Sequence, residues 1–402
     1  MLFLGPQENT LSRASLLFSR LSLSQGIVCP PDYHTIEEAV IKQSDYFTNM
    51  KKCIFYGLSG EGLGHASRTL AVLDHLSEYE VHLFTYGKAY SYLKNKVKNL
   101  HRIQGIMFSY KNGAVDYRAT ADSILYFLSG GLQSNKNFIE DMIKIHRPDL
   151  FITDFEPSIA RMANKAGVPL ISVDNQHKFA YYDLIHTPLW MRMYGFLCGL
   201  AAKMLVPKPH KTVISTFHHK VLFPRKFNVT VTNGLIRKSL EDATPTKGDY
   251  TLVYLRDSIS DIVLEAISQI PTNFRIYGAK DTPLKRCLEH NSFMKFMPLG
   301  SGFVDDLLAC RAIISSAGNQ LITEARHCKK PCLVVPEPKQ YEQYINAFYV
   351  DRLGFGRWCD AKDLKDSVVR EFLCDFQGRF EDARNGVYDV LKVIRETCGT
   401  PS

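Results

Sequence analysis

The sequence predicts an α/β protein with two parallel sheets, and three features of the chain lead to this prediction. From Met50 onward, short apolar runs rich in β-branched and aromatic residues alternate with helix-length amphipathic stretches. The alternation restarts near Asp249, after a polar linker at residues 241–249. The chain has 402 residues, enough for two or three domains of ordinary size. We therefore expect two doubly wound, Rossmann-like domains, each with a sheet covered by helices on both faces.

The first predicted domain contains four strands and four helices after Met50. The strands are expected at residues 53–58, 81–86, 149–155 and 170–175. The helices are expected at residues 64–77, 90–97, 120–146 and 157–166. This order of short buried strands and helices is typical of a parallel sheet.

The second predicted domain repeats the same pattern. Its strands are expected at residues 250–255, 274–278, 293–299, 311–316 and 331–336. Its helices are expected at residues 258–269, 302–309, 319–327 and 340–351, and residues 378–398 also have helical spacing. Two such domains are expected to leave a cleft between them.

The first 49 residues differ from the rest of the chain. The segment LSRASLLFSRLSLS is rich in Ser, Leu and Arg and faintly resembles a transit peptide, but it lacks the apolar core of a secretory signal. Met50, followed by KKCIFYGL, has the features of a second start. We therefore expect residues 1–49 to be an extension or a misassigned start. The first domain is then residues 50–240, and the second is residues 241–402.

The composition indicates a soluble globular protein. Hydrophobic residues make up 45% of the chain and charged residues 22%, which excludes a disordered or fibrous protein. The net charge of +8 favours contact with anionic lipid, phosphate or nucleotide, but no block of basic residues indicates nucleic-acid binding. The ten cysteines include no C-x-x-C pair, so we expect reduced thiols, no zinc site and a cytoplasmic location.

One apolar segment, residues 187–211, interrupts the alternation of strands and helices. Its charged residues Arg192 and Lys203 leave too short an apolar stretch for a membrane-spanning helix. The segment is expected to form either a buried helix or an interfacial helix, with Trp190, Phe196 and Leu197 in lipid and the cations at the headgroups. The second alternative would place the protein on the inner face of the cytoplasmic membrane as a peripheral protein.

A glycine-rich segment, GLSGEGLGHASR at residues 57–68, joins the first predicted strand to the first predicted helix. Such a turn presents backbone N–H groups and a helix N-terminus, which attract negative charge. A dinucleotide site would need an acidic residue at the end of the next strand, which reads FTYG, and a P-loop would need Gly-Lys-Ser/Thr. Neither is present. Because a helix N-terminus disfavours a positive charge, His65 at the first helical turn is our first candidate for a general base, and Arg68 lies one turn further on.

A second polar segment follows the strand at residues 311–316. The turn from Ser316 to Gly318 leads into a helix and predicts a seat for a diphosphate. Glu324, within the first two turns of this helix, is placed to accept hydrogen bonds from ribose hydroxyls. The segment Gln340–Asn346 is rich in amides, which both donate and accept and therefore suit sugar hydroxyls.

These two segments resemble the GT-B glycosyltransferases, both the MurG-type family 28 and the glycosyltransferase family 1 homologues whose first loop reads G-E-G-x-G-H-x-x-R. In this chain the loop runs from Gly60 to Arg68 and includes Glu61, Gly62, Gly64 and His65. On the donor side, the matching residues are Gly318 to Glu324, then Gln343, Tyr344 and Asn346. The resemblance extends over residues 50–398, although only these two stretches are diagnostic.

The resemblance implies a transferase that moves a hexose-type sugar from a nucleoside diphosphate, UDP in the first instance, to an acceptor bound by the first domain. The apolar, basic segment 187–211 favours a lipid-linked or polysaccharide acceptor. It implies no metal and no cofactor, and a role in cell-envelope or polysaccharide biosynthesis. It also implies that the final helix crosses back to the first domain and that the nucleobase lies against residues 296–299. The implied donor contacts are Ser316 and Gly318 for the diphosphate, Glu324 for the ribose and Gln343 for the sugar, with Asn319, Gln340 and Asn346 nearby.

Several residues of the first domain are candidates for the catalytic base. After His65 come Asp154 and Glu156, because ligands of open α/β sheets bind at the carboxyl ends of strands. Glu61 and His177 are further candidates, and Asn175 and His177 either orient the acceptor or cap the following segment. Asp154 and Glu156 have the spacing of a metal-binding pair, but no supporting ligand cluster is evident in the sequence.

Two alternative functions use the same architecture. One is a UDP-sugar 2-epimerase, which would need acid and base residues at the sugar C2. The other is a sugar-nucleotide-binding protein without catalytic activity. Release of UDP only in the presence of an acceptor would distinguish a transferase from both.

Overall fold

The structure is a computed structural model, and it describes residues 51–111, 114–182, 184, 186–218, 228–300 and 302–399. The predicted extension, residues 1–49, lies outside the described residues. All cysteines within the described ranges are free thiols.

The first parallel sheet has the strand order β3-β2-β1-β6-β7-β8-β9. Most of its strands are apolar and buried, because helices cover both faces of the sheet. The strand β1 has its predicted bounds, and β2, β6 and β7 begin and end within one residue of the prediction, whereas the sequence patterns missed β3, β8 and β9. The bounds are β1 Cys53–Leu58, β2 Glu80–Thr85, β3 Leu100–Arg102, β6 Leu150–Asp154, β7 Leu170–Asp174, β8 Lys211–Ser215 and β9 Val229–Thr232.

The helices of the first lobe differ from the prediction mainly in their ends. The helix predicted over 120–146 is divided by a π-helical turn, Phe127–Gly131, between α5 and α6. A short antiparallel pair, β4 Tyr110–Lys111 and β5 Ala114–Val115, precedes α5. The helices are α3 Gly64–Leu73, α4 Gly87–Leu93, α5 Tyr117–Tyr126, α6 Leu132–His146, α7 Pro157–Ala166, α8 Lys178–Tyr181, α9 Leu189–Leu205 and α10 Lys238–Glu241.

The second parallel sheet has the order β12-β11-β10-β13-β14-β15. Its strands are β10 Tyr250–Tyr254, β11 Asn273–Tyr277, β12 Met294–Met297, β13 Ala312–Ser315, β14 Cys332–Val334 and β15 Gly356–Trp358. Its helices are α11 Ser260–Ile267, α12 Pro283–Leu288, α13 Phe303–Ala309, α14 Asn319–His327, α15 Tyr341–Arg352 and α16 Asp366–Asp375. In both sheets the fourth strand lies beside the first, so each sheet has a topological switch point there, which is where doubly wound sheets bind ligands.

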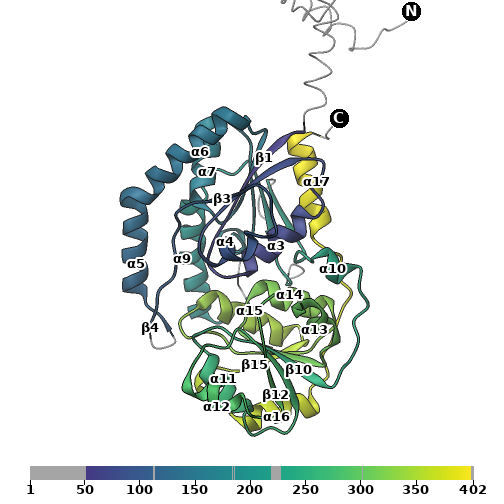
Figure 1. The fold of residues 1–402 in the computed structure, drawn as a ribbon. Coiled ribbons are helices and arrows are strands. Elements are labelled where there is room, and N and C mark those ends of the chain that lie inside the picture. The colour runs from purple at the N-terminus through teal and green to yellow at the C-terminus, as the bar shows by residue number, and fades with distance from the viewer. Residues whose placement is uncertain are drawn as a thin grey trace, which may run out of the picture. The chain divides into compact units, whose positions relative to one another are not determined.

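The last helix, α17 Val387–Cys398, packs on the first sheet, beside α3 (Figure 1). Its residues Val387, Val390 and Ile394 are fully buried in the same cluster as Ile54 and Tyr56 of β1. The prediction that this helix begins near residue 378 is wrong. Residues 376–386 are not helical, and the Asn385 side chain hydrogen-bonds the backbone N–H and C=O of Ile236.

The helix α9 is buried on one side only. Gly195 and Gly199 face the neighbouring segment, and a Cβ at Gly199 would collide with the Phe179 carbonyl oxygen. The opposite side is apolar and exposed, so the alternative of a fully buried helix is wrong. The exposed residues are Leu189, Trp190, Met193, Phe196, Leu197, Leu200 and Met204. Within the described ranges, no helix combines the length and apolarity needed to cross a bilayer.

Candidate active site

The glycine loop and Asp154 meet at the switch point of the first sheet. Leu58, the last residue of β1, is in register with Asp154, the last residue of β6. The Ser59 amide, where the loop begins, donates to the Asp154 carbonyl oxygen at 3.0 Å. Two neighbouring strands therefore deliver the loop and the carboxylate to the same edge of the sheet.

Two positions of this loop require glycine. A Cβ at Gly60 would collide with the Tyr86 backbone, and Gly62 has a φ of +83°, a conformation that L side chains rarely adopt. The next glycine, Gly64, faces the other lobe, since a Cβ there would lie 3.6 Å from the Gln320 Cβ of α14. The loop thus approaches the N-terminal end of α14.

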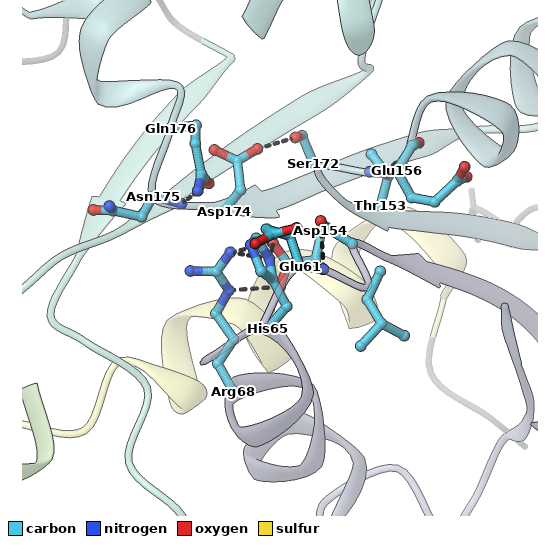
Figure 2. A network of polar contacts seen from close by, with 12 residues as sticks. Glu61, His65, Arg68, Thr153, Asp154, Glu156, Ser172, Asp174, Asn175 and Gln176 are labelled. Atoms are coloured by element: carbon cyan, nitrogen blue, oxygen red, sulfur yellow. Dashed lines mark hydrogen bonds and ion pairs between the residues drawn. The ribbon is translucent and has the colours of Figure 1, made fainter. Parts of the chain in front are cut away.

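His65, Arg68 and Asp154 form one polar network (Figure 2). His65 Nδ1 lies 2.9 Å from Asp154 Oδ1, and Arg68 Nε donates to Asp154 Oδ2 at 2.5 Å. Arg68 Nη2 also donates to Asp154 Oδ1 and lies 2.6 Å from His65 Nδ1. Asp154 is fully buried, and the His65 side chain is 12% exposed. The structure therefore brings together three of the residues that the sequence proposed separately.

His65 Nδ1 faces two groups with opposite hydrogen-bonding roles. Asp154 Oδ1, 2.9 Å away, only accepts hydrogen bonds, whereas Arg68 Nη2, 2.6 Å away, only donates them. In the tautomer that carries its proton on Nδ1, directed at Asp154, the Nε2 lone pair is available to accept a proton from another group. A carboxylate that holds an imidazole in this way also stabilises the imidazolium that forms when the base acts.

Glu156 lies apart from this network, as Figure 2 shows. Its side chain caps α7, accepting from the Ser158 amide at 3.0 Å and the Ile159 amide at 2.6 Å. Phe155, between the two carboxylates, has a φ of +60°, and the turn directs Asp154 and Glu156 to different surroundings. The geometry therefore favours Asp154 over Glu156 as a catalytic residue.

His177 is fully buried beside Asp174. Its Nδ1 lies 2.6 Å from Asp174 Oδ2, which also accepts from the Ser172 hydroxyl at 2.6 Å. Burial alone would raise the pKa of Asp174, but His177 and these hydrogen bonds lower it to about 2. Because no side-chain atom of His177 reaches solvent, the geometry does not favour His177 as the base.

In the second lobe, the turn from Ser316 to Gly318 leads from β13 into α14 at the switch point. A Cβ at Gly318 would meet no atom within 4 Å, so the space beside the turn is open there. Asn319, the first residue of α14, is 6% exposed, and its Nδ2 is buried without a hydrogen-bond partner among the described residues. An unpaired buried donor at a helix N-terminus is suited to an anion.

Glu324 is buried and pairs with Arg237, a residue that the sequence analysis did not identify. Arg237 donates to both carboxylate oxygens, from Nε at 2.9 Å and from Nη2 at 2.6 Å. Gln320 Nε2 donates to Glu324 Oε1 at 2.9 Å. These contacts hold the carboxylate in one orientation.

The amide-rich segment is divided between two structural roles. Gln340 caps α15, accepting from the Glu342 amide at 3.1 Å. Gln343 Nε2 instead donates to the buried Glu337 at 2.6 Å, and Arg256 Nε lies 2.9 Å from the same carboxylate. Arg256 Nη2 also lies 3.4 Å from Glu61 of the glycine loop.

Lys178 is a fully buried cation that connects the two lobes, and sequence reasoning missed it. Its Nζ donates to Asn175 Oδ1 at 3.1 Å and to Asn346 Oδ1 at 2.7 Å. Asn346 Nδ2 donates to the Ala317 carbonyl oxygen at 2.9 Å, within the predicted diphosphate turn. Burial lowers the pKa of Lys178 to about 8. Its place in the sequence, directly after the strand-end residues Asn175 and His177, is the signal that could have identified it.

Comparison with known proteins gives one family match. The sequence profile of the family described as glycosyl transferase family 1 matches residues 52–376. No curated protein matches the chain.

Solved structures of several glycosyltransferases resemble this fold. MurG of Acinetobacter baumannii is 15% identical, with a TM-score of 0.54 over 86% of this chain and 99% of that chain. UGT71G1 of Medicago truncatula, complexed with UDP-glucose, is 12% identical, with a TM-score of 0.57 over 87% and 99%. UGT2 of Phytolacca americana, complexed with UDP-2-fluoro-glucose and pterostilbene, is 12% identical, with a TM-score of 0.56 over 86% and 94%. The fold is therefore GT-B, as the resemblance implied.

Proposed function

The chain belongs to glycosyl transferase family 1, and we propose that it transfers a hexose from a UDP-linked donor, bound by the second lobe, to a hydroxyl group of an acceptor bound by the first. The observation that carries this proposal is the pairing of His65 with buried Asp154 in a loop that approaches the N-terminus of α14. The proposed base, His65, and the proposed phosphate seat at the start of α14 would then face the same space from the two lobes.

The donor site is proposed at the start of α14. The main-chain N–H groups of the turn from Ser316 to Gly318, the helix dipole and the unpaired Asn319 Nδ2 would receive the diphosphate. Glu324, oriented by Arg237, would accept hydrogen bonds from the ribose hydroxyls. UGT71G1 and UGT2, solved with UDP-sugars, support UDP as the nucleotide.

In the proposed reaction, His65 Nε2 takes the proton of the acceptor hydroxyl while the oxygen of this hydroxyl forms a bond to the sugar C1. The bond between C1 and the diphosphate oxygen breaks, and the nucleoside diphosphate leaves with the electron pair. Asp154 stabilises the imidazolium, and the α14 N-terminus stabilises the leaving phosphate.

We propose that this transfer needs no metal ion. The Asp154 oxygens are occupied by His65 and Arg68, and the Glu156 oxygens accept from backbone amides. Neither carboxylate of the apparent metal-binding pair is therefore directed at a donor phosphate. The charge on the leaving group is instead assigned to the helix N-terminus.

The acceptor is proposed to be lipid-linked and presented at a membrane surface on the cytoplasmic side. The exposed apolar face of α9 would enter the headgroup boundary, with the exposed Arg192 and Lys203 near anionic lipid. The same helix contacts the donor lobe, because Tyr194 stacks on Tyr341 of α15 with ring centroids 3.5 Å apart. This contact connects the proposed membrane face to the proposed site.

The experiment is a UDP-release assay with UDP-hexoses and lipid-linked acceptors, using unaltered protein, His65→Ala and His290→Ala. We expect His65→Ala to lower kcat by roughly 10²- to 10⁴-fold, the usual contribution of a general base. UDP affinity, measured by calorimetry, should stay within about twofold. His290 is an exposed histidine of the second lobe, and its replacement should change neither quantity. Full activity of His65→Ala would remove His65 from the proposed role.

A further inference from the structure

Three histidines and one glutamate of the first lobe cluster on β2, β3 and the end of α6. Glu80 and His82 belong to β2, His101 belongs to β3, and His146 is the last residue of α6. Glu80 is in register with Cys53, at the start of β1. His82 is in register with Phe55, three residues before the end of β1 and the glycine loop, or about 10 Å at 3.3 Å per residue. None of Glu80, His82 and His146 is among the residues assigned to the transfer chemistry proposed above.

The distances in this cluster match those between ligands of one ion. His82 Nε2 lies 2.8 Å from Glu80 Oε1, and His146 Nδ1 lies 3.5 Å from the same oxygen. One ligand atom from each of the three residues lies within 4.8 Å of the other two. Two donors bound tetrahedrally to one zinc ion at about 2.1 Å are roughly 3.4 Å apart. Small side-chain rotations would therefore bring all three atoms to an ion.

His101 supplies the outer contact that metal-binding histidines usually have. His82 Nδ1 lies 3.0 Å from His101 Nε2. A histidine that binds a metal through one nitrogen generally donates from the other, which fixes the ring orientation. If His82 donates from Nδ1 to His101, its Nε2 lone pair faces the Glu80 carboxylate at 2.8 Å. Two such acceptors repel each other unless a metal ion or a proton lies between them.

The rings are held in place by packing and remain accessible from one side. His82 and His101 stack with their planes 14° apart, and the His146 ring contacts Phe55. The His82 side chain is 5% exposed, that of His146 is 26% exposed and that of Glu80 is 43% exposed. An ion would therefore enter from the side of Glu80 and find the imidazoles already oriented.

We propose that Glu80, His82 and His146 bind one Zn²⁺ ion, with water as the fourth ligand and His101 orienting His82. Two imidazoles and one carboxylate are a donor set that zinc takes, whereas Mg²⁺ and Ca²⁺ prefer oxygen ligands. The prediction of no zinc site rested on the spacing of cysteines, and the proposed ligands include none. The ion would join the start of β2 to the end of α6 and stabilise the first lobe.

The test is calorimetric titration of chelator-treated full-length protein with Zn²⁺, accompanied by thermal unfolding. We expect one Zn²⁺ per chain and a higher unfolding temperature with zinc present. Glu80→Gln and His146→Ala should each weaken zinc binding by roughly tenfold or more, and His101→Phe, which keeps a stacked ring, by roughly tenfold. His290→Ala is the matched control and should bind zinc like the unaltered protein.

Because His82 is buried, the half-buried ligands Glu80 and His146 are the residues to replace, and circular dichroism checks that their variants fold. Zinc binding of equal strength in the unaltered protein, Glu80→Gln and His146→Ala would overturn the proposal. A stoichiometry far below one ion per chain would also overturn it, since a proton on His82 Nε2 would then account for the contact with Glu80. Mg²⁺ should give no comparable heat, and equal binding of Mg²⁺ would contradict the assigned ligand set.

Discussion

At the scale of single residues, the buried carboxylate of Asp154 determines how the proposed base is held. Arg68 donates to it, His65 Nδ1 lies 2.9 Å from it, and it is fully buried. A buried charge is costly unless it is paired, so the network is expected to act as a unit. The sequence identified all three residues, but it did not show that one carboxylate binds both side chains.

Asp154→Asn tests whether this network acts as a unit, and Glu156→Gln, at the carboxylate two residues away, is the comparison. We expect kcat to fall at least a hundredfold, because an amide does not hold the His65 tautomer as a carboxylate does. Glu156→Gln should leave kcat within about threefold and lower the free energy of unfolding by about 1 kcal/mol, the usual value of a helix cap. Steady-state kinetics and urea unfolding check both variants. Equal losses of activity in the two would contradict the distinction drawn from the structure.

Lys178 predicts a pH dependence of stability. Burial lowers its folded-state pKa from 10.5 to about 8, so between these values the folded chain releases a proton that the unfolded chain keeps. Stability relative to Lys178→Met should therefore rise with pH across this window, by on the order of 3 kcal/mol. Below the window both states are protonated, and the buried charge keeps its full cost. Urea unfolding of both proteins from about pH 7 to pH 10.5 measures the difference, and a constant difference would contradict the account.

At the scale of elements, α14 combines the proposed phosphate seat with the proposed ribose contact. Its N-terminus follows β13 at the switch point, and Glu324 lies one and a half turns further along. The helix was predicted with its observed bounds. The pairing of Glu324 with Arg237 was not predicted, because Arg237 lies 87 residues away in the sequence and no local pattern links the two.

Glu324→Gln should weaken UDP binding by roughly tenfold, the value of one charge-assisted hydrogen bond to a hydroxyl. The same change leaves Arg237 with a neutral partner, so the unfolding temperature should also fall. Glu289→Gln, at an exposed glutamate of the same lobe, should change neither property. Calorimetry with UDP is the measurement, and unchanged UDP affinity in Glu324→Gln would remove this residue from the donor site.

The helix α9 predicts binding to anionic membranes. Replacing Phe196 and Leu200 together by Ser should weaken co-sedimentation with anionic vesicles tenfold or more, since each buried side chain contributes about 1.5–3 kcal/mol. Binding should also weaken with salt, because Arg192 and Lys203 contribute electrostatically. Phe293→Ser removes another exposed aromatic residue, 40% exposed, and should have no effect. Equal vesicle binding by all three proteins would contradict the membrane face.

At the scale of the whole molecule, the alternation of strands and helices was enough to predict two doubly wound sheets. It missed β3, β8, β9 and β15, because short or polar strands lack a periodic signal and gain their place from neighbouring strands. It also missed Lys178 and Arg256, each of which contacts a residue in the other half of the chain. The residues on the two turns were predictable from local chemistry, whereas the contacts that join the lobes depend on tertiary packing.

The most direct test of the central claim is a crystal structure of the protein with a bound UDP-sugar. We expect the diphosphate to accept hydrogen bonds from the backbone of Ser316 to Gly318 and from Asn319, with the sugar C1 facing His65 Nε2. A nucleotide bound at the glycine loop of the first sheet, with the turn before α14 unoccupied, would contradict the proposed division of roles between the two lobes.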